Sequence, residues 1–400
     1  MSNSKFDPTK LDAATNDGHD YIQEGDWEEK ESNRWSIFLS GLNAKVIASL
    51  SDTVFAQVKE SLEEQFNSTN KWIAEYEKTT DPKLTACKQE KQRLEKLLIL
   101  IEKRGSKKEK SSLIKIKKEQ KLTEIRNEII DTEPTGEDMA FTHSVLCQVG
   151  LPRSKVDGDS FKRTSGDTWL FVQAGMLDEG AGPVMQQIPY GATPRLALAW
   201  VSTYAKRHNT KEIPLGESAA EFLRLMGMDS QGARYTTLRK QMYALAACRL
   251  QMGFKGRSFN EQIVKQFDAW ASNKEKNQRS FWPGTMVLTD DYYTELVLHG
   301  VPLDNRALQA LKGSAFDLDV YCWLAHRLHR IEGNSTVLHW KTIRQQFGTE
   351  YKGINADKDF KKTFLPSLKR VLAVYPKGIV KPVTGGIALY YSPPPVPYLK

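Results

Sequence analysis

A helical pattern that occurs twice in the second half of the chain constrains its fold more than any other feature. In the first copy a helix is predicted to start at Thr193-Pro194, because Thr caps helices well and Pro suits the first helical turn. A strand-like link at residues 211–215 follows, and a capping box from Ser218 to Glu221 opens a second helix. A third helix is predicted from Ala233 to Cys248, with Tyr235, Leu238, Met242 and Leu245 on its buried side and Tyr243 on the other.

The second copy has the same order of elements. Residues from Ser314 to Asp317 cap its first helix, and residues 336–338 form the link. A short helix from Trp340 to Phe347 ends at Gly348. The third helix is predicted to bury Phe360, Phe364, Leu368, Val371 and Leu372.

A β-hairpin at residues 379–391, around a Gly-Gly turn, closes the second copy. In the first copy the corresponding hairpin is less clear, with a candidate turn at Lys255-Gly256-Arg257 and a candidate strand at 285–288. The winged helix-turn-helix fold has this order of elements: helix, strand, helix, turn, polar-faced helix and hairpin. The sequence therefore predicts a helix-rich α+β protein with two tandem winged-helix domains, at residues 139–300 and 301–400, preceded by a helical N-terminal region.

The N-terminal third differs in composition from the rest. Residues 1–45 are rich in Asp, Glu, Asn and Ser, which predicts an acidic and largely disordered start. Apolar residues recur at helical spacing over residues 46–130, which predicts a helical hairpin or coiled-coil-like region with a bend at Gly105-Ser106. The lysines between Lys107 and Lys121 are interpreted as a solvated helix face rather than a phosphate contact, because charge runs usually only interact with water.

The polar sides of the two third helices have the residue types that DNA recognition requires. Arg and Lys bond guanine edges and phosphates, and Thr bonds bases or contacts the thymine methyl group. An ordinary exposed helix surface is the alternative, but it mixes both signs of charge, whereas acidic residues are almost absent from these faces after the helix start. The candidate DNA-binding residues are Arg234, Thr236, Thr237, Arg239 and Lys240 in the first copy, Lys255 and Arg257 at its candidate turn, and Lys358, Lys361, Lys362, Lys369 and Arg370 in the second copy.

The net charge of the chain is consistent with a polyanionic binding partner. The formal net charge is +8 and the sequence pI is about 9.0, which favours nucleic acid. The four cysteines form no CxxC pair, which argues against a zinc ribbon or a redox motif, and they are expected to be reduced and mostly buried. The chain has no run of about eighteen apolar residues and no apolar signal-peptide core, so we expect a cytoplasmic protein without a membrane span.

No catalytic constellation is visible in the sequence. It lacks a GxxxxGKS/T phosphate loop and an HExxH zinc motif. His326 and His329 form HxxH, but arginines lie beside them and no carboxylate or cysteine is near in sequence, so a metal site is not expected. Tyr292-Tyr293 beside Asp290-Asp291 permits a nuclease interpretation, although core tyrosines at the end of an element explain the pattern better. We predict a binding protein with no catalytic residue, cofactor or metal.

Several separate segments, in order, resemble the plasmid RepA replication protein family. The earlier ones are Phe141-Thr-His-Ser-Val-Leu-Cys-Gln-Val-Gly-Leu-Pro-Arg153, Pro189-Tyr-Gly-Ala-Thr-Pro-Arg195 and Arg234-Tyr-Thr-Thr-Leu-Arg-Lys-Gln241. The later ones are residues 314–328, 340–348, 360–364, 385–389 and 392–396. The resemblance covers roughly residues 139–400 and leaves the N-terminal third outside.

This resemblance implies an initiator of plasmid replication that binds repeated sequences (iterons) at the origin. Such proteins help to open AT-rich DNA, recruit host replication proteins and repress their own promoter, often as dimers. The expected partners are therefore double-stranded origin DNA, a host helicase or initiator, and a second copy of the chain. The alternatives are a winged-helix transcriptional repressor without an initiation role, a relaxase or nuclease, and a structural partition protein that oligomerises through its N-terminal hairpin.

Overall fold

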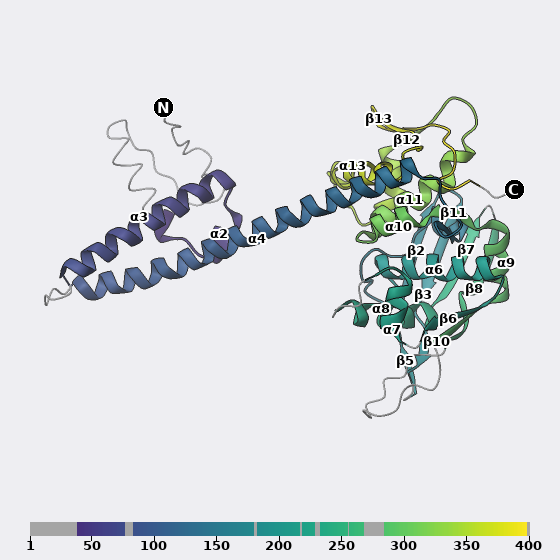
Figure 1. Cartoon of the computed structure of the whole chain (residues 1–400), viewed down its shortest axis with the longest axis horizontal. Coiled ribbons are helices and arrows are strands. Elements are labelled where there is room, and N and C mark those ends of the chain that lie inside the picture. Colours follow the sequence, from purple (N-terminus) through teal and green to yellow (C-terminus); the bar gives the residue numbers. More distant parts are fainter. Residues whose placement is uncertain are drawn as a thin grey trace. The chain divides into compact units, whose positions relative to one another are not determined.

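The computed structural model of the protein describes residues 38–76, 83–179, 182–216, 218–228, 233–254, 256–267 and 284–397. Its contacts divide the chain into two compact units, Met1–Ile116 and Lys117–Lys400, whose elements are labelled in Figure 1. The boundary between the units falls inside the long helix α4 (Lys83–Asp131). Most of the segment predicted to be disordered, residues 1–45, lies outside the described residues.

The first unit is a helical hairpin with a small apolar core. Helices α2 (Ala44–Ser49) and α3 (Asp52–Tyr76) pack with the first part of α4 around Leu39, Ile47, Val58, Leu62, Leu94, Leu97 and Ile101. Arg104 donates to the carbonyls of Ile47 and Leu50, both at 2.6 Å, which satisfies the C-terminal end of α2. The predicted bend at Gly105-Ser106 is wrong, because α4 runs through both residues. One glycine costs a helix about 1 kcal/mol, and the Lys and Glu residues around it are good helix formers.

The second unit is a helix-rich α+β structure, as the sequence predicts. Its helices after α4 are α5 (Ser144–Gln148), α6 (Ala192–His208), α7 (Ala219–Leu225), α8 (Ala233–Ala247), α9 (Asp290–His299), α10 (Asn305–Leu311), α11 (Ala315–Arg327), α12 (Trp340–Phe347) and α13 (Ala356–Val374). None of the helices in the described part of the chain combines the length and the apolar character that crossing a membrane requires.

The described strands of this unit form small antiparallel sheets. One sheet has the order β2 (Ser160–Ser165), β3 (Thr168–Gln173), β7 (Arg249–Phe254), β8 (Arg257–Gln262). Two three-stranded sheets have the orders β6 (Glu212–Gly216), β10 (Gly284–Leu288), β9 (Val264–Phe267) and β12 (Thr336–His339), β14 (Gly386–Leu389), β13 (Val380–Val383). The two-stranded pairs are β1 (Met139–Thr142) with β11 (Val301–Asp304), and β4 (Met176–Asp178) with β5 (Pro183–Met185).

Two segments of the second unit share one connectivity. The first segment runs through α6, β6, α7, α8, β9 and β10, and the second runs through α11, β12, α12, α13, β13 and β14. In each segment the strand after the first helix lies at one edge of the sheet, and the last strand lies in the middle. The repeated order of elements that the sequence predicts is therefore present in both segments.

The hairpin of the first segment differs from the sequence prediction. Gly256 turns the chain with a φ of 81°, but it joins β7 to β8 in the four-stranded sheet. The strand that closes the first segment is β10, which contains the predicted residues 285–288 and pairs with β9 and β6. The candidate turn and the candidate strand thus belong to different sheets, because β7 and β8 are inserted between α8 and β9.

Helix starts follow the predicted caps with one exception. The hydroxyls of Ser218 and Ser314 accept hydrogen bonds from the N–H groups three residues later, both at 3.2 Å. Helix α6, however, begins at Ala192 after Gly191, whose φ is 85°, so the predicted start at Thr193 is wrong. Pro194 tolerates this shift because it still lies in the first turn, where its missing N–H has no helical partner.

Truncation of Leu238 is expected to destabilise the second unit. Its side chain is fully buried in the core of the first segment, so Leu238→Ala should lower the free energy of unfolding by about 2–5 kcal/mol. Leu298→Ala is the control, because Leu298 is 66% exposed and its truncation should cost less than about 0.5 kcal/mol. Urea denaturation followed by tryptophan fluorescence measures both values, and equal losses would contradict this description of the core.

Candidate nucleic-acid interface

The first half of α8 presents the candidate residues of the first segment to solvent. Arg234, Thr236, Thr237 and Lys240 are exposed, whereas Leu238 and residues 241–247 are buried. The helix contains no acidic residue. Gln241 fixes it in place by accepting a hydrogen bond from the N–H of Tyr190 at 2.7 Å. An anchored helix with an exposed N-terminal half is how recognition helices bring side chains to base edges.

The burial of two tyrosines of α8 is the reverse of what the sequence predicts. Tyr243, predicted to face outward, is 3% exposed, and Tyr235, predicted to be buried, is 37% exposed. The Nε of Arg239 donates to the Tyr243 hydroxyl at 3.0 Å, and the guanidinium lies 5.1 Å from the ring centre. Burial raises the pKa of Tyr243, and the bond from Arg239 partly offsets this rise. Because its hydroxyl has this donor, the tyrosine fits a buried position.

Helix α13 presents the candidate lysines of the second segment. Phe360, Phe364 and Leu368 are buried on its inner side, and Lys358, Lys361, Lys362 and Lys369 are exposed. Lys361 Nζ lies 5.3 Å from the centre of the Trp340 ring, and Lys362 pairs with Asp359 at 3.1 Å. Both contacts lie at the surface, where they contribute little to stability, so the ammonium groups remain available for phosphates.

Arg370 has a packing role that the sequence does not indicate. Its Nε and Nη2 donate to the two carboxylate oxygens of Asp317 at 2.7 and 2.8 Å. Ser367 donates to the same carboxylate at 2.5 Å. Asp317 is buried in the first turn of α11, so this group ties α13 to α11. The Arg370 side chain is 45% exposed, which leaves part of it accessible at the surface.

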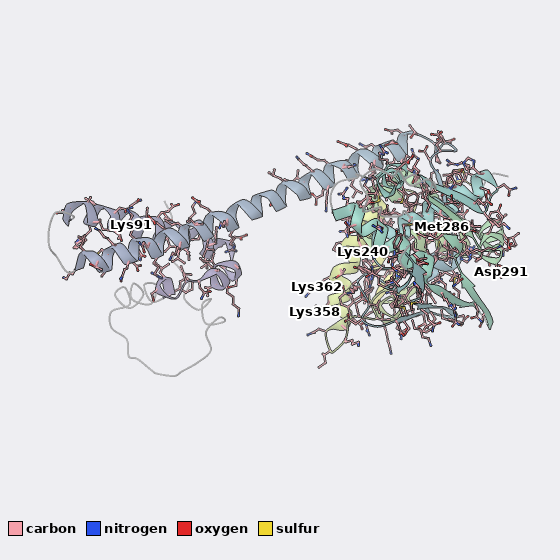
Figure 2. The ribbon with its side chains drawn as sticks, turned by 90° about the horizontal axis from the view of Figure 1, so that it is seen from below. Lys91, Lys240, Met286, Asp291, Lys358 and Lys362 are labelled. Atoms are coloured by element: carbon pink, nitrogen blue, oxygen red, sulfur yellow. The ribbon has the colours of Figure 1, made fainter. Side chains whose placement is uncertain are left out.

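The two basic helices face the same side of the second unit. Figure 2 shows Lys240 of α8 and Lys358 and Lys362 of α13 along one edge, with Asp291 at the opposite edge.

Two candidates remain, Lys255 and Arg257. Lys255 lies outside the described residues, and Arg257 begins strand β8. Lys381, which is not among the candidates predicted from the sequence, is exposed on β13 with its Nζ 5.4 Å from the centre of the Tyr390 ring. Its position in the correctly predicted hairpin is the signal that could have identified it, because winged-helix hairpins contact the flanking backbone.

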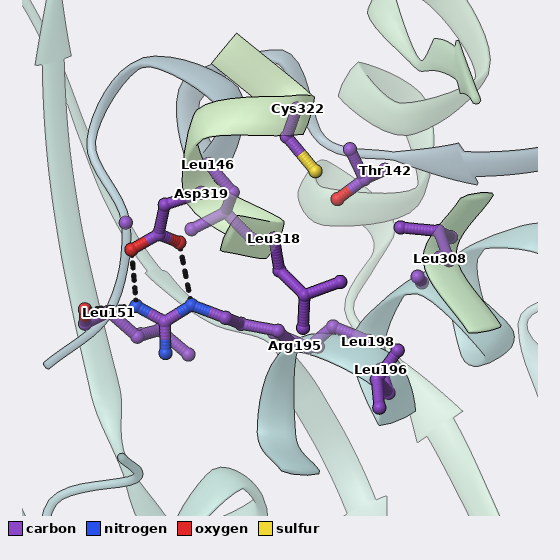
Figure 3. Close-up of a pocket in the computed structure, with 12 residues that line it drawn as sticks. Thr142, Leu146, Leu151, Arg195, Leu196, Leu198, Leu308, Leu318, Asp319 and Cys322 are labelled. Atoms are coloured by element: carbon purple, nitrogen blue, oxygen red, sulfur yellow. Dashed lines mark hydrogen bonds and ion pairs between the residues drawn. The ribbon is translucent and has the colours of Figure 1, made fainter. Parts of the chain in front are cut away.

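The first helices of the two segments are joined by a buried ion pair between Arg195 of α6 and Asp319 of α11 (Figure 3). The Nε and Nη2 of Arg195 donate to the carboxylate at 2.6 and 2.9 Å. The other three N–H groups donate to the carbonyls of Leu151, Pro152 and Gly191. All five donors of the guanidinium are therefore satisfied. The side chains of Arg195 and Asp319 are 10% and 6% exposed.

A small cavity lies beside this pair. Its volume is about 30 Å³, and Leu146, Leu318 and Cys322 are among its lining residues (Figure 3). A space of this size accommodates one or two water molecules rather than a ligand. The ion pair joins α6 to α11 directly. Strands β1 and β11, which pair with each other, lie outside the two segments and precede the first and the second of them, respectively, in the chain.

The residues considered for metal binding or nuclease chemistry have structural partners. Within the described ranges, no three His, Cys, Asp or Glu side chains form a metal-binding cluster. His326 accepts a hydrogen bond from Arg330 at 2.7 Å, and the Nδ1 of His329 lies 2.9 Å from the carbonyl oxygen of Ala325. Tyr292 is buried with its ring stacked on His143, and Asp290 pairs with Lys211.

The buried histidines predict a loss of stability in mild acid. Burial lowers the pKa of His326 to about 3 and that of His143 to about 4, so both stay neutral in the folded protein at pH 5. A histidine of the unfolded chain has a pKa near 6.5. The unfolded state therefore binds more protons below that pH, and the free energy of unfolding falls as the pH decreases from 6.5.

This effect is measurable with His326→Gln, which keeps an acceptor for Arg330. Between pH 7 and pH 5 the wild-type protein should lose about 1–2 kcal/mol more stability than the variant. Urea denaturation at the two pH values gives the difference. The same loss in both proteins would mean that His326 is protonated in the fold.

Comparisons with known proteins find a family similarity in the central part of the chain. Residues 188–342 match the family model described as plasmid encoded RepA protein, which confirms the resemblance predicted from the sequence for this stretch. The matched region contains α6, α7, α8 and α11 and ends within α12. No curated protein matches the chain.

Two crystal structures of RctB domains resemble the fold weakly. The structure of RctB domains 2-3 has 12% sequence identity and a TM-score of 0.40, and the match covers 61% of this chain and 94% of that chain. The structure of selenomethionine derivatives of domain 2 and domain 3 has 13% identity and a TM-score of 0.37, with coverage of 57% and 83%. At these scores the similarity says nothing about function.

Proposed function

We propose that the chain is a plasmid replication initiator that binds repeated sequences at the plasmid origin through two winged-helix modules. The match of residues 188–342 to plasmid encoded RepA protein is the observation that carries the initiator role. The modules are the first and second segments, and their shared connectivity supports the winged-helix assignment. Double-stranded origin DNA, host replication proteins and a second copy of the chain are the proposed partners, and the cytoplasm is the proposed location.

In this proposal, α8 and α13 enter successive major-groove faces of one duplex. Arg234 and Lys240 of α8 are exposed on a helix without acidic residues, and α13 exposes four lysines. The hairpin of β13 and β14 follows α13 in the chain, so Lys381 is proposed to contact the flanking phosphates. In this proposal, the buried ion pair between Arg195 of α6 and Asp319 of α11 helps to hold the two modules, and so α8 and α13, at one spacing.

Melting of the origin would not require catalysis by this chain. Bending or wrapping of DNA on several bound copies, together with host proteins, supplies free energy for strand opening. We infer that the protein is not an enzyme and cleaves no strand. Incubation of supercoiled plasmid with the purified protein and magnesium is expected to give no nicked product, and nicked circles would support the relaxase or nuclease alternative instead.

The central test compares origin and random fragments of equal length at moderate ionic strength. An initiator should retain a fragment with tandem repeats at least about a thousand-fold better than a random fragment. Equal retention would overturn the proposal. Deletion of the gene from its replicon separates the initiator from a repressor, because only loss of an initiator abolishes plasmid maintenance.

A further inference from the structure

A groove in the second unit is separate from the two basic helices. It has a volume of about 440 Å³ and is lined by residues of β1, α6, α7 and α10 and of the turns beside them. Among its described lining residues, none belongs to α8 or α13. Leu196, Ala199, Met226 and Leu308 form an apolar floor. The volume lies in the range of binding sites, unlike that of the cavity at the ion pair.

Two arginines lie on the rim of this groove. Arg224, at the end of α7, is exposed and has no side-chain partner among the described residues. Arg207 donates to the carbonyls of Gly136 and Met139, and no carboxylate of the described residues pairs with it. Glu137 is the only acidic residue among the described residues that line the groove. The rim therefore favours an anionic ligand.

The aromatic side chains of the groove do not provide a slot for a nucleotide base. The rings of Trp200 and Tyr204 stack on each other with centroids 5.5 Å apart. Those of Tyr204 and His208 lie 4.2 Å apart. Because the three rings contact one another along α6, no gap between two parallel ring planes remains for a base. They form an apolar wall instead.

The length of the groove along α6 matches a helix of about three turns. Its lining residues run along α6 from Leu196 to His208, a length of about 18 Å at the helical rise of 1.5 Å per residue. Leu225, which is 48% exposed, stands at the edge formed by α7. An amphipathic helix of about three turns places its apolar side into a groove of this kind through anchors spaced three and four residues apart.

We propose that this groove docks an acidic amphipathic helix of a partner protein. The apolar side of the helix would lie against Leu196, Trp200 and Leu225, and its carboxylates would face Arg207 and Arg224. This docking site rests on the proposed initiator function, because an initiator must recruit a host protein. Such recruitment needs a surface that bound DNA leaves free.

Fluorescence anisotropy with the full chain and two labelled peptides tests the proposal. Both peptides have about twelve residues with leucines on one face, and the other face carries glutamates in one and lysines in the other. The glutamate peptide should bind at least about ten-fold more tightly than the lysine peptide. Arg224→Glu should remove or reverse this preference, and Leu225→Asp should weaken binding of the glutamate peptide by about ten-fold.

Arg249→Glu is the matched control, because Arg249 is an exposed arginine of β7 that does not line the groove. It should leave the preference unchanged. Equal binding of the two peptides, or an unchanged preference in Arg224→Glu, would overturn the proposal. Tight binding of a fluorescent nucleotide that is lost in Arg224→Glu would overturn it in favour of a nucleotide site. Retention of origin DNA, measured on the same variants, should not change. The peptide assay therefore tests the groove proposal, and the DNA assay separately tests the initiator role.

Discussion

Replacement of Asp319 by alanine is expected to lower the free energy of unfolding of the second unit by about 3–5 kcal/mol. The carboxylate is 6% exposed and is the sole acidic partner of Arg195 within the described residues, which is itself 10% exposed. Its removal leaves a guanidinium charge buried without a counterion, and burial of an unpaired charge is strongly unfavourable. Urea denaturation of the wild-type protein and the variant gives the difference.

Two controls separate the cost of an unpaired charge from the value of the pair. Arg195→Met combined with Asp319→Leu removes both charges and should recover most of the lost stability, because apolar replacements of buried pairs are often neutral. Asp290→Ala breaks the exposed pair with Lys211 and should cost less than about 1 kcal/mol. If Asp319→Ala cost no more than Asp290→Ala, the junction would not be held by this pair.

The sequence predicts the parts of the fold that depend on neighbours in the chain. The caps at Ser218 and Ser314 and the hairpin from Val380 to Leu389 follow from residues three to ten positions apart. Helical periodicity also finds the buried side of α13. Helical periodicity misplaces Tyr235 and Tyr243 of α8, because a tyrosine has an apolar ring and a polar hydroxyl and fits either side of a helix. Tyr243 can be buried because its hydroxyl accepts a hydrogen bond from Arg239.

Strand pairings between residues far apart in the sequence cannot be predicted from local sequence patterns. The hairpin of β2 and β3 has a local signal, two strand-like runs around Gly166-Asp167. Nothing local indicates that β3 pairs with β7 or that β1 pairs with β11, since those partners lie far apart in the sequence. This is why the turn at Gly256 is assigned to the wrong sheet by sequence reasoning.

At the candidate interface, too, local patterns predict single residues but not the long-range partners of those residues. The lysines of α13 are found from residue type and helical spacing alone. The pairing of Arg370 with Asp317 joins residues 53 positions apart, and that of Arg195 with Asp319 joins residues 124 positions apart. Only the folded structure shows that these two arginines serve the packing of the protein, whereas Lys358, Lys361 and Lys369 have no acidic partner among the described residues.

Origin binding by the wild-type protein is expected to depend steeply on salt. If the two modules neutralise about six to ten phosphates, the affinity should fall by about three to five powers of ten between 50 and 200 mM salt. Substitution of Lys358, Lys361 and Lys369 by alanine should reduce the slope of log affinity against log salt by about one unit for each phosphate that the variant no longer neutralises. Fluorescence anisotropy of a labelled origin fragment, titrated at several salt concentrations, measures the slope.

The matched control is the triple alanine variant of Lys117, Lys118 and Lys121, which are exposed on the part of α4 that belongs to the second unit. These lysines are predicted to form a solvated helix face, so their removal should leave both the slope and the preference for the origin unchanged. The comparison holds residue type and number of charges constant and changes only the helix that carries them. A reduced slope in the α4 variant and an unchanged slope in the α13 variant would place the DNA on α4 rather than on the two modules.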